Sequence, residues 1–139
     1  MKSKIYIWTI GHSSVPLEVF LNKLKEHKIQ VLCDCRHIPL SRWCPHFNKN
    51  ALHRALATET IKYLWKGENL AGRGINKNYE QTIDELVALA KRGTRVCVMC
   101  VEKNHENCHR FTMLTPSFEA RGLLVVHIEY ENEKRNSRN

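Results

Sequence analysis

Short apolar runs alternate along this chain with segments in which apolar residues recur every three or four positions. The short runs are rich in β-branched and aromatic residues, which predicts buried strands, and they occupy residues 5–10, 29–35, 61–65, 95–101 and 123–130. The periodic segments predict amphipathic helices over residues 16–27, 49–58, 80–91 and 109–121. Strands and helices that alternate in this way predict a single α/β domain, Rossmann-like, with a mainly parallel sheet of about five strands and helices on both faces.

Residues typical of helix ends and breaks flank several of these segments. Ser13 or Ser14 is placed to cap the first helix, with Pro16 in its first turn. Gly93 follows the third helix and suits the left-handed turn that ends many helices. Pro116 lacks the backbone N–H that a helix interior requires, so we expect the last helix to kink or split there.

The composition fits one globular domain. The chain has 139 residues, of which 42% are hydrophobic and 26% charged, as in ordinary folded domains. We expect the domain to span residues 1–131, followed by a polar, flexible tail over residues 132–139. No apolar run approaches the roughly 18 residues needed to cross a membrane, and no secretory signal precedes the first strand. A cytoplasmic protein with six reduced cysteines is therefore expected.

The formal net charge of +8 favours phosphorylated or polyanionic partners through long-range attraction, although it serves solubility equally well. Basic and aromatic residues also interleave between residues 36 and 54, among them Arg42, Trp43, His46 and Phe47. Such a pattern can grip a nucleic-acid backbone and stack bases, and its helical part can also be a solvated face. Nucleic acid therefore remains an open alternative as a partner.

Ionisable and small polar residues follow three of the predicted strands, at the point where each strand ends. In an open parallel sheet, ligands bind beyond the carboxyl ends of the strands, where the following loops meet. We therefore expect these residues to form one polar site suited to an anion. They are Gly11, His12, Ser13 and Ser14 after the first strand, Asp34, Arg36 and His37 at the end of the second, and Cys100, Glu102, Cys108, His109 and Arg110 after the fourth.

The carboxylates and guanidiniums of this group suggest acid–base chemistry on an anion. Asp34 or Glu102 would act as general acid or base, and Arg36 and Arg110 would hold a phosphate or carboxylate with their planar forks. The alternative for Asp34 is structural, since it can cap a helix or pair with Arg36. Only the arrangement in space separates these interpretations.

The remaining members could carry a proton, a nucleophile or an anion contact. His12 or His109 would shuttle protons near neutral pH, because a carboxylate beside two guanidiniums stays ionised. Cys108 falls where a loop turns into a helix, a setting that lowers the pKa of a thiol, so Cys108 or Cys100 would serve as a nucleophile. The segment from Gly11 to Ser14 precedes a helix and offers N–H groups and hydroxyls to a phosphate, or simply caps that helix.

The cysteines could also bind a metal ion. Cys97 and Cys100 have the CxxC spacing of zinc sites, but inside a strand they point to opposite faces and cannot share one ion. A site made of Cys100, Cys108 and either His109 or His12 remains as an alternative. The chain has no GxxxxGK[ST] or GxGxxG motif and no CxxxxxR loop, which leaves common nucleotide hydrolysis, dinucleotide redox and cysteine phosphatase chemistry without support.

Several short motifs, taken together, resemble those of the family called Domain of Unknown Function 488, from about Thr9 to Ile128. The resemblance implies the same α/β fold and the same strand-end site, and it adds Ser41 and Arg42 to the expected anion-binding residues. Small departures occur at Ala71, Cys35 and Val101. The motifs are Thr9-Ile10-Gly11-His12-Ser13, Asp34-Cys35-Arg36, Ser41-Arg42, Leu70-Ala71-Gly72, Met99-Cys100-Val101-Glu102 and Cys108-His109-Arg110.

These observations favour an enzyme with hydrolase- or transferase-like activity on a phosphate-bearing or nucleotide-like small molecule. The first alternative is a non-catalytic module that binds nucleic acid or a nucleotide, and the second is a metal-binding thiol protein. The sequence sets neither the reaction, nor a cofactor, nor the oligomeric state, and no membrane association is expected.

Overall fold

The computed structural model describes residues 4–72, 76–102, 108 and 110–130, except the side chains of residues 110 and 111. The expected tail over residues 132–139 and the site residue His109 lie outside this range. Strands and helices alternate in the order that the sequence pattern predicted. They are β1 (Tyr6–Gly11), α1 (Leu17–Glu26), β2 (Val31–Asp34), α2 (Lys49–Thr58), β3 (Lys62–Trp65), α3 (Tyr79–Lys91), β4 (Val96–Cys100), α4 (Thr115–Glu119) and β5 (Leu124–His127).

All five strands are parallel and lie in the order β3-β2-β4-β1-β5. The register keeps the carboxyl ends of the central strands level, because Gly11 of β1 pairs with Cys100 of β4 and Asp34 of β2 pairs with Met99 of β4. This register brings three of the expected polar strand exits to one edge of the sheet. The α/β class predicted from the sequence is confirmed.

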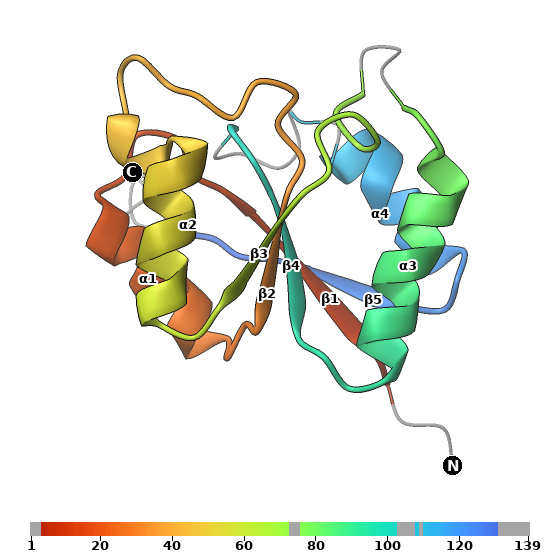
Figure 1. The fold of residues 1–139 in the computed structure, drawn as a ribbon. Helices are drawn as coiled ribbons and strands as arrows, with labels where there is room; N and C mark the ends of the chain where they lie inside the picture. Colours follow the sequence, from red (N-terminus) through yellow and green to blue (C-terminus); the bar gives the residue numbers. More distant parts are fainter. Residues whose placement is uncertain (1–3, 73–75, 103–107, 109, 131–139) are drawn as a thin grey trace, which may run out of the picture.

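Two helices cover each face of the sheet (Figure 1). Phe20 and Leu24 of α1 pack with Leu52 and Leu56 of α2 in one apolar core on the first face. On the other face, α3 and α4 contribute a second core with residues such as Leu86 and Phe118. The strands are buried on both sides, which explains why they read as continuous apolar runs rather than as alternating ones.

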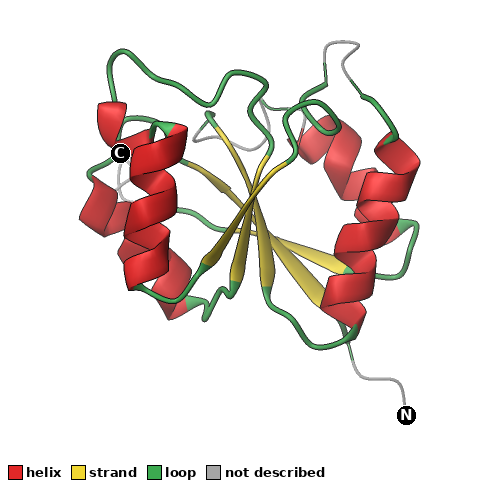
Figure 2. Cartoon of the chain, viewed as in Figure 1, coloured by secondary structure: helices red, strands yellow, loops and turns green. Residues whose placement is uncertain are grey.

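The connections diverge at the carboxyl end of β4. The neighbours β1 and β2 both lead into helices on the α1–α2 face, whereas β4 leads towards α4 on the opposite face. Connections that diverge in this way mark the position at which open α/β sheets bind ligands, in the crevice beyond the carboxyl ends of their strands. Figure 2 shows the long loops gathered at this end of the sheet, including the one that joins β2 to α2.

Local sequence signals explain most element ends, with one correction. Gly93 has φ +94° directly after α3, as expected for a glycine that ends a helix. The segment before β5 splits as Pro116 predicted, into a π-helical turn, Arg110–Leu114, and the short α4. The prediction of a serine cap for α1 is wrong: Pro16 occupies the cap position and no side chain caps the helix.

Among the described residues, no helix is long and apolar enough to cross a membrane.

Candidate functional site

The centre of the candidate site is an ion pair between Asp34, the last residue of β2, and Arg36. The guanidinium donates from Nε to Oδ1 of Asp34 at 2.9 Å and from Nη2 to Oδ2 at 2.7 Å, and the backbone N–H of Arg36 donates to Oδ1 at 3.0 Å. The exposed fraction of the side chain is 3% for Arg36 and 0% for Asp34. The structure thus brings these two predicted residues together. The same contact also agrees with the alternative for Asp34, in which it pairs with Arg36 for a structural reason.

The neighbouring strand β3 supports this pair from the side. Tyr63 donates its hydroxyl to Oδ2 of Asp34 at 2.6 Å, and the indole N–H of Trp65 donates to the carbonyl oxygen of Arg36 at 2.8 Å. Burial, followed by the contact with Asp34, raises the pKa of Tyr63, so this hydroxyl remains a donor. A Cβ at Gly67 would stand 2.1 Å from the carbonyl oxygen of Arg36, so only glycine fits where this loop crosses the pair.

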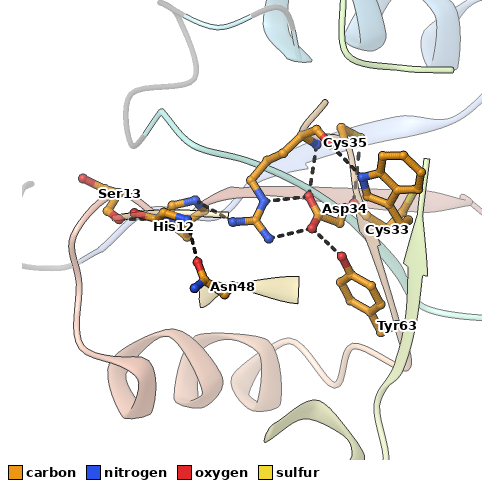
Figure 3. Close-up of polar contacts among 10 residues, drawn as sticks. His12, Ser13, Cys33, Asp34, Cys35, Asn48 and Tyr63 are labelled. Atoms are coloured by element: carbon orange, nitrogen blue, oxygen red, sulfur yellow. Dashed lines mark hydrogen bonds and ion pairs between the residues drawn. The ribbon is translucent and has the colours of Figure 1, made fainter. Parts of the chain in front are cut away.

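His12 approaches the same guanidinium from the end of β1. Figure 3 shows His12 and Tyr63 on opposite sides of Asp34, with the guanidinium between His12 and the carboxylate. The Nη1 atom of Arg36 lies 3.4 Å from Nε2 of His12, and Nδ1 of His12 lies 2.8 Å from the carbonyl oxygen of Ser13. The ring stacks on Phe47 with centroids 4.6 Å apart. These contacts require Nδ1 to carry the proton and leave Nε2 as an acceptor.

The surroundings of His12 keep it neutral. Desolvation by burial, with a smaller contribution from the positive charge of Arg36, lowers the pKa of His12 to about 4. A residue with this pKa is almost entirely unprotonated at pH 7. At neutral pH His12 can therefore accept a proton or a hydrogen bond, and its expected role as a proton shuttle stays a prediction.

The expected phosphate cradle after β1 is largely occupied by the sheet. The backbone N–H of His12 donates to the carbonyl oxygen of Cys100 at 3.0 Å, and that of Ser13 donates to Val101 at 2.8 Å. Gly11 offers its carbonyl oxygen to the hydroxyl of Tyr130 at 2.7 Å. The N–H groups of His12 and Ser13, which were expected to bind an anion, therefore extend the pairing of β1 with β4 instead. The side chain of Ser13 is half-buried at the outer edge of the candidate site, which we call the rim.

The loop between β2 and α2 forms another part of the rim. The hydroxyl of Ser41 accepts the N–H of Cys44 at 2.9 Å, and the N–H of Ser41 donates to Oδ1 of Asn48. Ser41 therefore shapes the turn, whereas Arg42 beside it is exposed. Of the two expected anion-binding arginines whose side chains the structure describes, Arg36 is buried and Arg42 is exposed to solvent.

The residues after β4 divide between two environments. Cys100 and Cys108 are buried, and their sulfur atoms lie 2.8 Å apart. Glu102 is exposed, in contrast to the fully buried Asp34. The side chain of Arg110 lies outside the described residues, so its expected proximity to Asp34 and Glu102 stays a prediction.

The faces of the strands are arranged as the alternation of side chains predicted. Cys97 belongs to the core beneath α1 and α2, while Cys33 and Cys35 belong to the core beneath α3 and α4. Asp34 points away from Cys33 and Cys35, towards Tyr63. Within the described part of the chain, no three histidine, cysteine or acidic side chains are grouped closely enough to hold a metal ion.

A hollow in the surface lies at the opposite edge of the sheet. It has a volume of about 950 Å³ and includes Arg95 and Arg121 among its lining residues. Both cations already have intramolecular contacts: Arg95 stacks on Trp8 at 4.3 Å and donates to the carbonyl of His27, and Arg121 contacts Asp84. These contacts explain the two arginines structurally, so this hollow offers less reason to expect a ligand than the strand-end site.

Sequence reasoning missed four residues that hold the buried pair in place: Phe47, Tyr63, Trp65 and Gly67. Tyr63 and Trp65 alternate on the strand next to β2, which is a weak signal of a common face. The close approach at Gly67 leaves no trace in the sequence beyond the glycine itself.

Comparison with known proteins supports the resemblance over part of the chain. Residues 16–78 match the family model described as Domain of unknown function DUF488. The matched segment contains Asp34, Arg36 and Tyr63, but neither His12 nor the cysteines after β4. It is therefore shorter than the span from Thr9 to Ile128 that the motifs indicated. No curated protein and no solved structure matches the chain significantly.

Proposed function

We propose that this chain, whose residues 16–78 match the family model of Domain of unknown function DUF488, is an enzyme with hydrolase- or transferase-like activity on a phosphate-bearing or nucleotide-like small molecule. The site would lie at the carboxyl ends of β1, β2 and β4. The observation that carries the proposal is the buried Asp34–Arg36 pair beside this crevice. Burying two charges costs several kcal/mol per ion before their attraction is counted, so such pairs often mark functional sites.

The buried pair is better suited to positioning than to direct chemistry. Asp34 engages Nε and Nη2 of Arg36, which fixes the plane of the guanidinium and directs Nη1 towards His12. An anion held near Arg36 would offset the positive charge that helps to lower the pKa of His12. Substrate binding would then make His12 a stronger base, able to take a proton that it does not hold in the unliganded protein.

Exposed residues around the pair would contact the substrate directly. Glu102 follows β4 and is open to solvent, so its carboxylate can reach a bound molecule as a general acid or base. The half-buried hydroxyl of Ser13 and the exposed guanidinium of Arg42 can donate to phosphate oxygens. In this arrangement the basic net charge of +8 would draw anionic substrates towards the protein.

The test is a turnover assay with nucleoside phosphates, sugar phosphates and an aryl phosphate, followed by phosphorus NMR so that hydrolysis and transfer are both detected. Once a substrate is found, Glu102→Gln should lower kcat/KM by about 100-fold or more, as expected for the loss of a general acid or base. Ser13→Ala should raise KM. Glu102 is exposed and Ser13 is half-buried, and neither belongs to the apolar cores, so the variants should fold normally.

A matched control is available at an exposed position away from the site. Glu119→Gln on α4 should retain the kinetic constants of the original protein. If Glu102→Gln and Ser13→Ala both keep full turnover, the site lies elsewhere. If no phosphate compound binds or reacts, the proposed substrate class is wrong.

A second function is favoured by one observation on the loop between β2 and α2. This loop exposes Ile38, Leu40 and Trp43, with Trp43 88% exposed, and Arg42 lies beside them. Next to it is a hollow of about 460 Å³ with Lys49 and Arg54 and no acidic residue in its lining. An exposed indole among cations is suited to stacking a base while the cations contact phosphates, so the alternative is binding of single-stranded nucleic acid.

Salt dependence separates this function from the enzymatic one. Binding of a fluorescent single-stranded oligonucleotide should weaken steeply as salt rises, because each neutralised phosphate releases counterions. Trp43→Ala should weaken binding at every salt concentration, whereas Tyr6→Ala, at an exposed aromatic residue on β1, should not. A flat salt response or an unaffected Trp43→Ala variant would exclude the loop as a nucleic-acid interface.

A further inference from the structure

The two cysteines that flank the exit of β4 are in sulfur-to-sulfur contact. Cys100 is the last residue of β4, and Cys108 lies just before the π-helical turn that leads into α4. Their Sγ atoms are 2.8 Å apart. A disulfide requires about 2.05 Å, so a shift of less than one ångström separates the dithiol from a covalent bond.

Two of the other cysteines are poorly placed or poorly reactive for this bond. Cys97 is on the opposite face of β4, in the core beneath α1 and α2. Cys35 is buried, and its thiol donates to the carbonyl oxygen of Cys33 at 3.8 Å. The interaction with the Cys33 side chain, followed by burial, raises the pKa of Cys35, which keeps its thiol protonated and weakly reactive.

We propose that Cys100 and Cys108 form a dithiol–disulfide couple that exchanges with low-molecular-weight disulfides. This inference does not depend on the proposed enzymatic function. It rests on the 2.8 Å contact between these two sulfur atoms, at the end of β4 where the connections diverge.

The exchange proceeds in two balanced steps. The thiolate of Cys108, the more exposed of the two, attacks one sulfur of the small disulfide, which breaks the S–S bond and releases one small thiol. The thiolate of Cys100 then attacks the sulfur of Cys108 in the mixed disulfide and expels the second small thiol. Two electrons and two protons thus pass from the protein to the small disulfide, which becomes two thiols.

A disulfide between Cys100 and Cys108 would restrict the chain at the carboxyl end of β4. Cys100 pairs with Gly11 of β1, and its carbonyl oxygen accepts the N–H of His12. A disulfide would tie this point to the beginning of the segment that leads into α4, and the closed loop would restrict the unfolded chain. The oxidised protein should therefore unfold at a higher temperature than the reduced one.

The experiment equilibrates the full-length protein in buffers of reduced and oxidised glutathione, then traps free thiols with an alkylating agent under denaturing conditions. All six cysteines should be labelled in the reduced protein, and two fewer in the oxidised protein. Peptide mass spectrometry should find a single cross-link, between Cys100 and Cys108. Cys97→Ser, on the other face of the same strand, should retain this transition.

Cys100→Ser and Cys108→Ser should each abolish the cross-link, and Cys108→Ser should also reduce the rate at which glutathione adducts form. Three results would overturn the proposal: all six thiols remaining free in oxidised glutathione, a cross-link between other cysteines, or a stable mixed disulfide that Cys100 does not resolve. Co-purified zinc that protects both thiols from alkylation would also overturn it, in favour of the metal alternative.

Discussion

Two arginines of this protein bind carboxylates with nearly the same geometry in opposite surroundings. Arg36 reaches Asp34 at 2.7 Å and 2.9 Å, and Arg121 reaches Asp84 at 2.7 Å and Glu80 at 3.1 Å. The first pair is at the carboxyl edge of the sheet, with exposed fractions of 3% and 0%. In the contact with Asp84 the arginine and the aspartate are 23% and 67% exposed.

The comparison shows that distance alone does not tell what an ion pair does. Water around the Arg121 contacts screens their attraction, and such pairs contribute little to stability. The Asp34–Arg36 pair has strong attraction but also a large desolvation cost, and apolar residues in its place would often be at least as stable. Stability alone therefore does not explain why this pair is at the strand ends, which is the reason for proposing that it positions a ligand.

The largest contrast is expected from the same substitution in both pairs. Asp34→Asn leaves the buried guanidinium of Arg36 without a counter-charge, which should cost about 3–5 kcal/mol of unfolding free energy. Asp84→Asn removes a carboxylate at the same 2.7 Å distance and is the matched control. Urea denaturation of both variants measures the difference. Equal losses would mean that burial does not set the strength of the Asp34–Arg36 pair.

The second prediction concerns pH. The pKa of His12 falls from 6.5 in the unfolded chain to about 4 in the folded protein, so between these values the unfolded state binds more protons. Stability is complete above pH 6.5 and decreases as the pH falls towards 4, with about 3 kcal/mol lost in total. The loss is large because protonation would place a charge in a buried, desolvated position, and to a smaller extent because Arg36 is a second cation beside it.

Denaturant unfolding between pH 4 and pH 7 would check this dependence. His12→Asn keeps a donor towards the carbonyl of Ser13 but cannot be protonated, so its stability should vary less over this range. His37→Asn, at an exposed histidine in the following loop, should leave the profile of the original protein unchanged. A profile of His12→Asn that matches the original protein would show that His12 does not titrate in this way.

Tyr63→Phe is expected to have a smaller effect. It removes the 2.6 Å hydrogen bond to Oδ2 of Asp34 but leaves both guanidinium contacts in place, so the expected loss is about 2 kcal/mol. Tyr6→Phe, at an exposed tyrosine on β1, is the control and should be close to neutral. A neutral Tyr63→Phe would mean that Arg36 alone satisfies the carboxylate.

For the Asp34–Arg36 pair, the sequence could predict the position at the strand ends but not the residues that surround it. The apolar runs and the helical periods specify a parallel sheet with helices on both faces, and a polar residue that ends a buried strand, such as Asp34, points to the carboxyl edge. Periodicity does not reveal the register between strands, because register depends on packing in three dimensions. For that reason the role of Tyr63, and the pairing of the His12 and Ser13 N–H groups with β4, appeared only in the structure.

The smallest effect, and the one that completes the comparison, is expected at the exposed pair. Arg121→Gln should cost about 0.2–1 kcal/mol at low salt, because its partners are mostly solvated, and this cost should fall as salt screens the attraction. The loss caused by Asp34→Asn should change little with salt, since ions do not reach a side chain with no exposed surface. Unfolding free energies of both variants at low and at 1 M sodium chloride, with 1 M corresponding to a screening length of about 3 Å, would test this. If both losses decreased in parallel, the two pairs would be screened alike, and the distinction between a buried positioning pair and a surface pair would no longer hold.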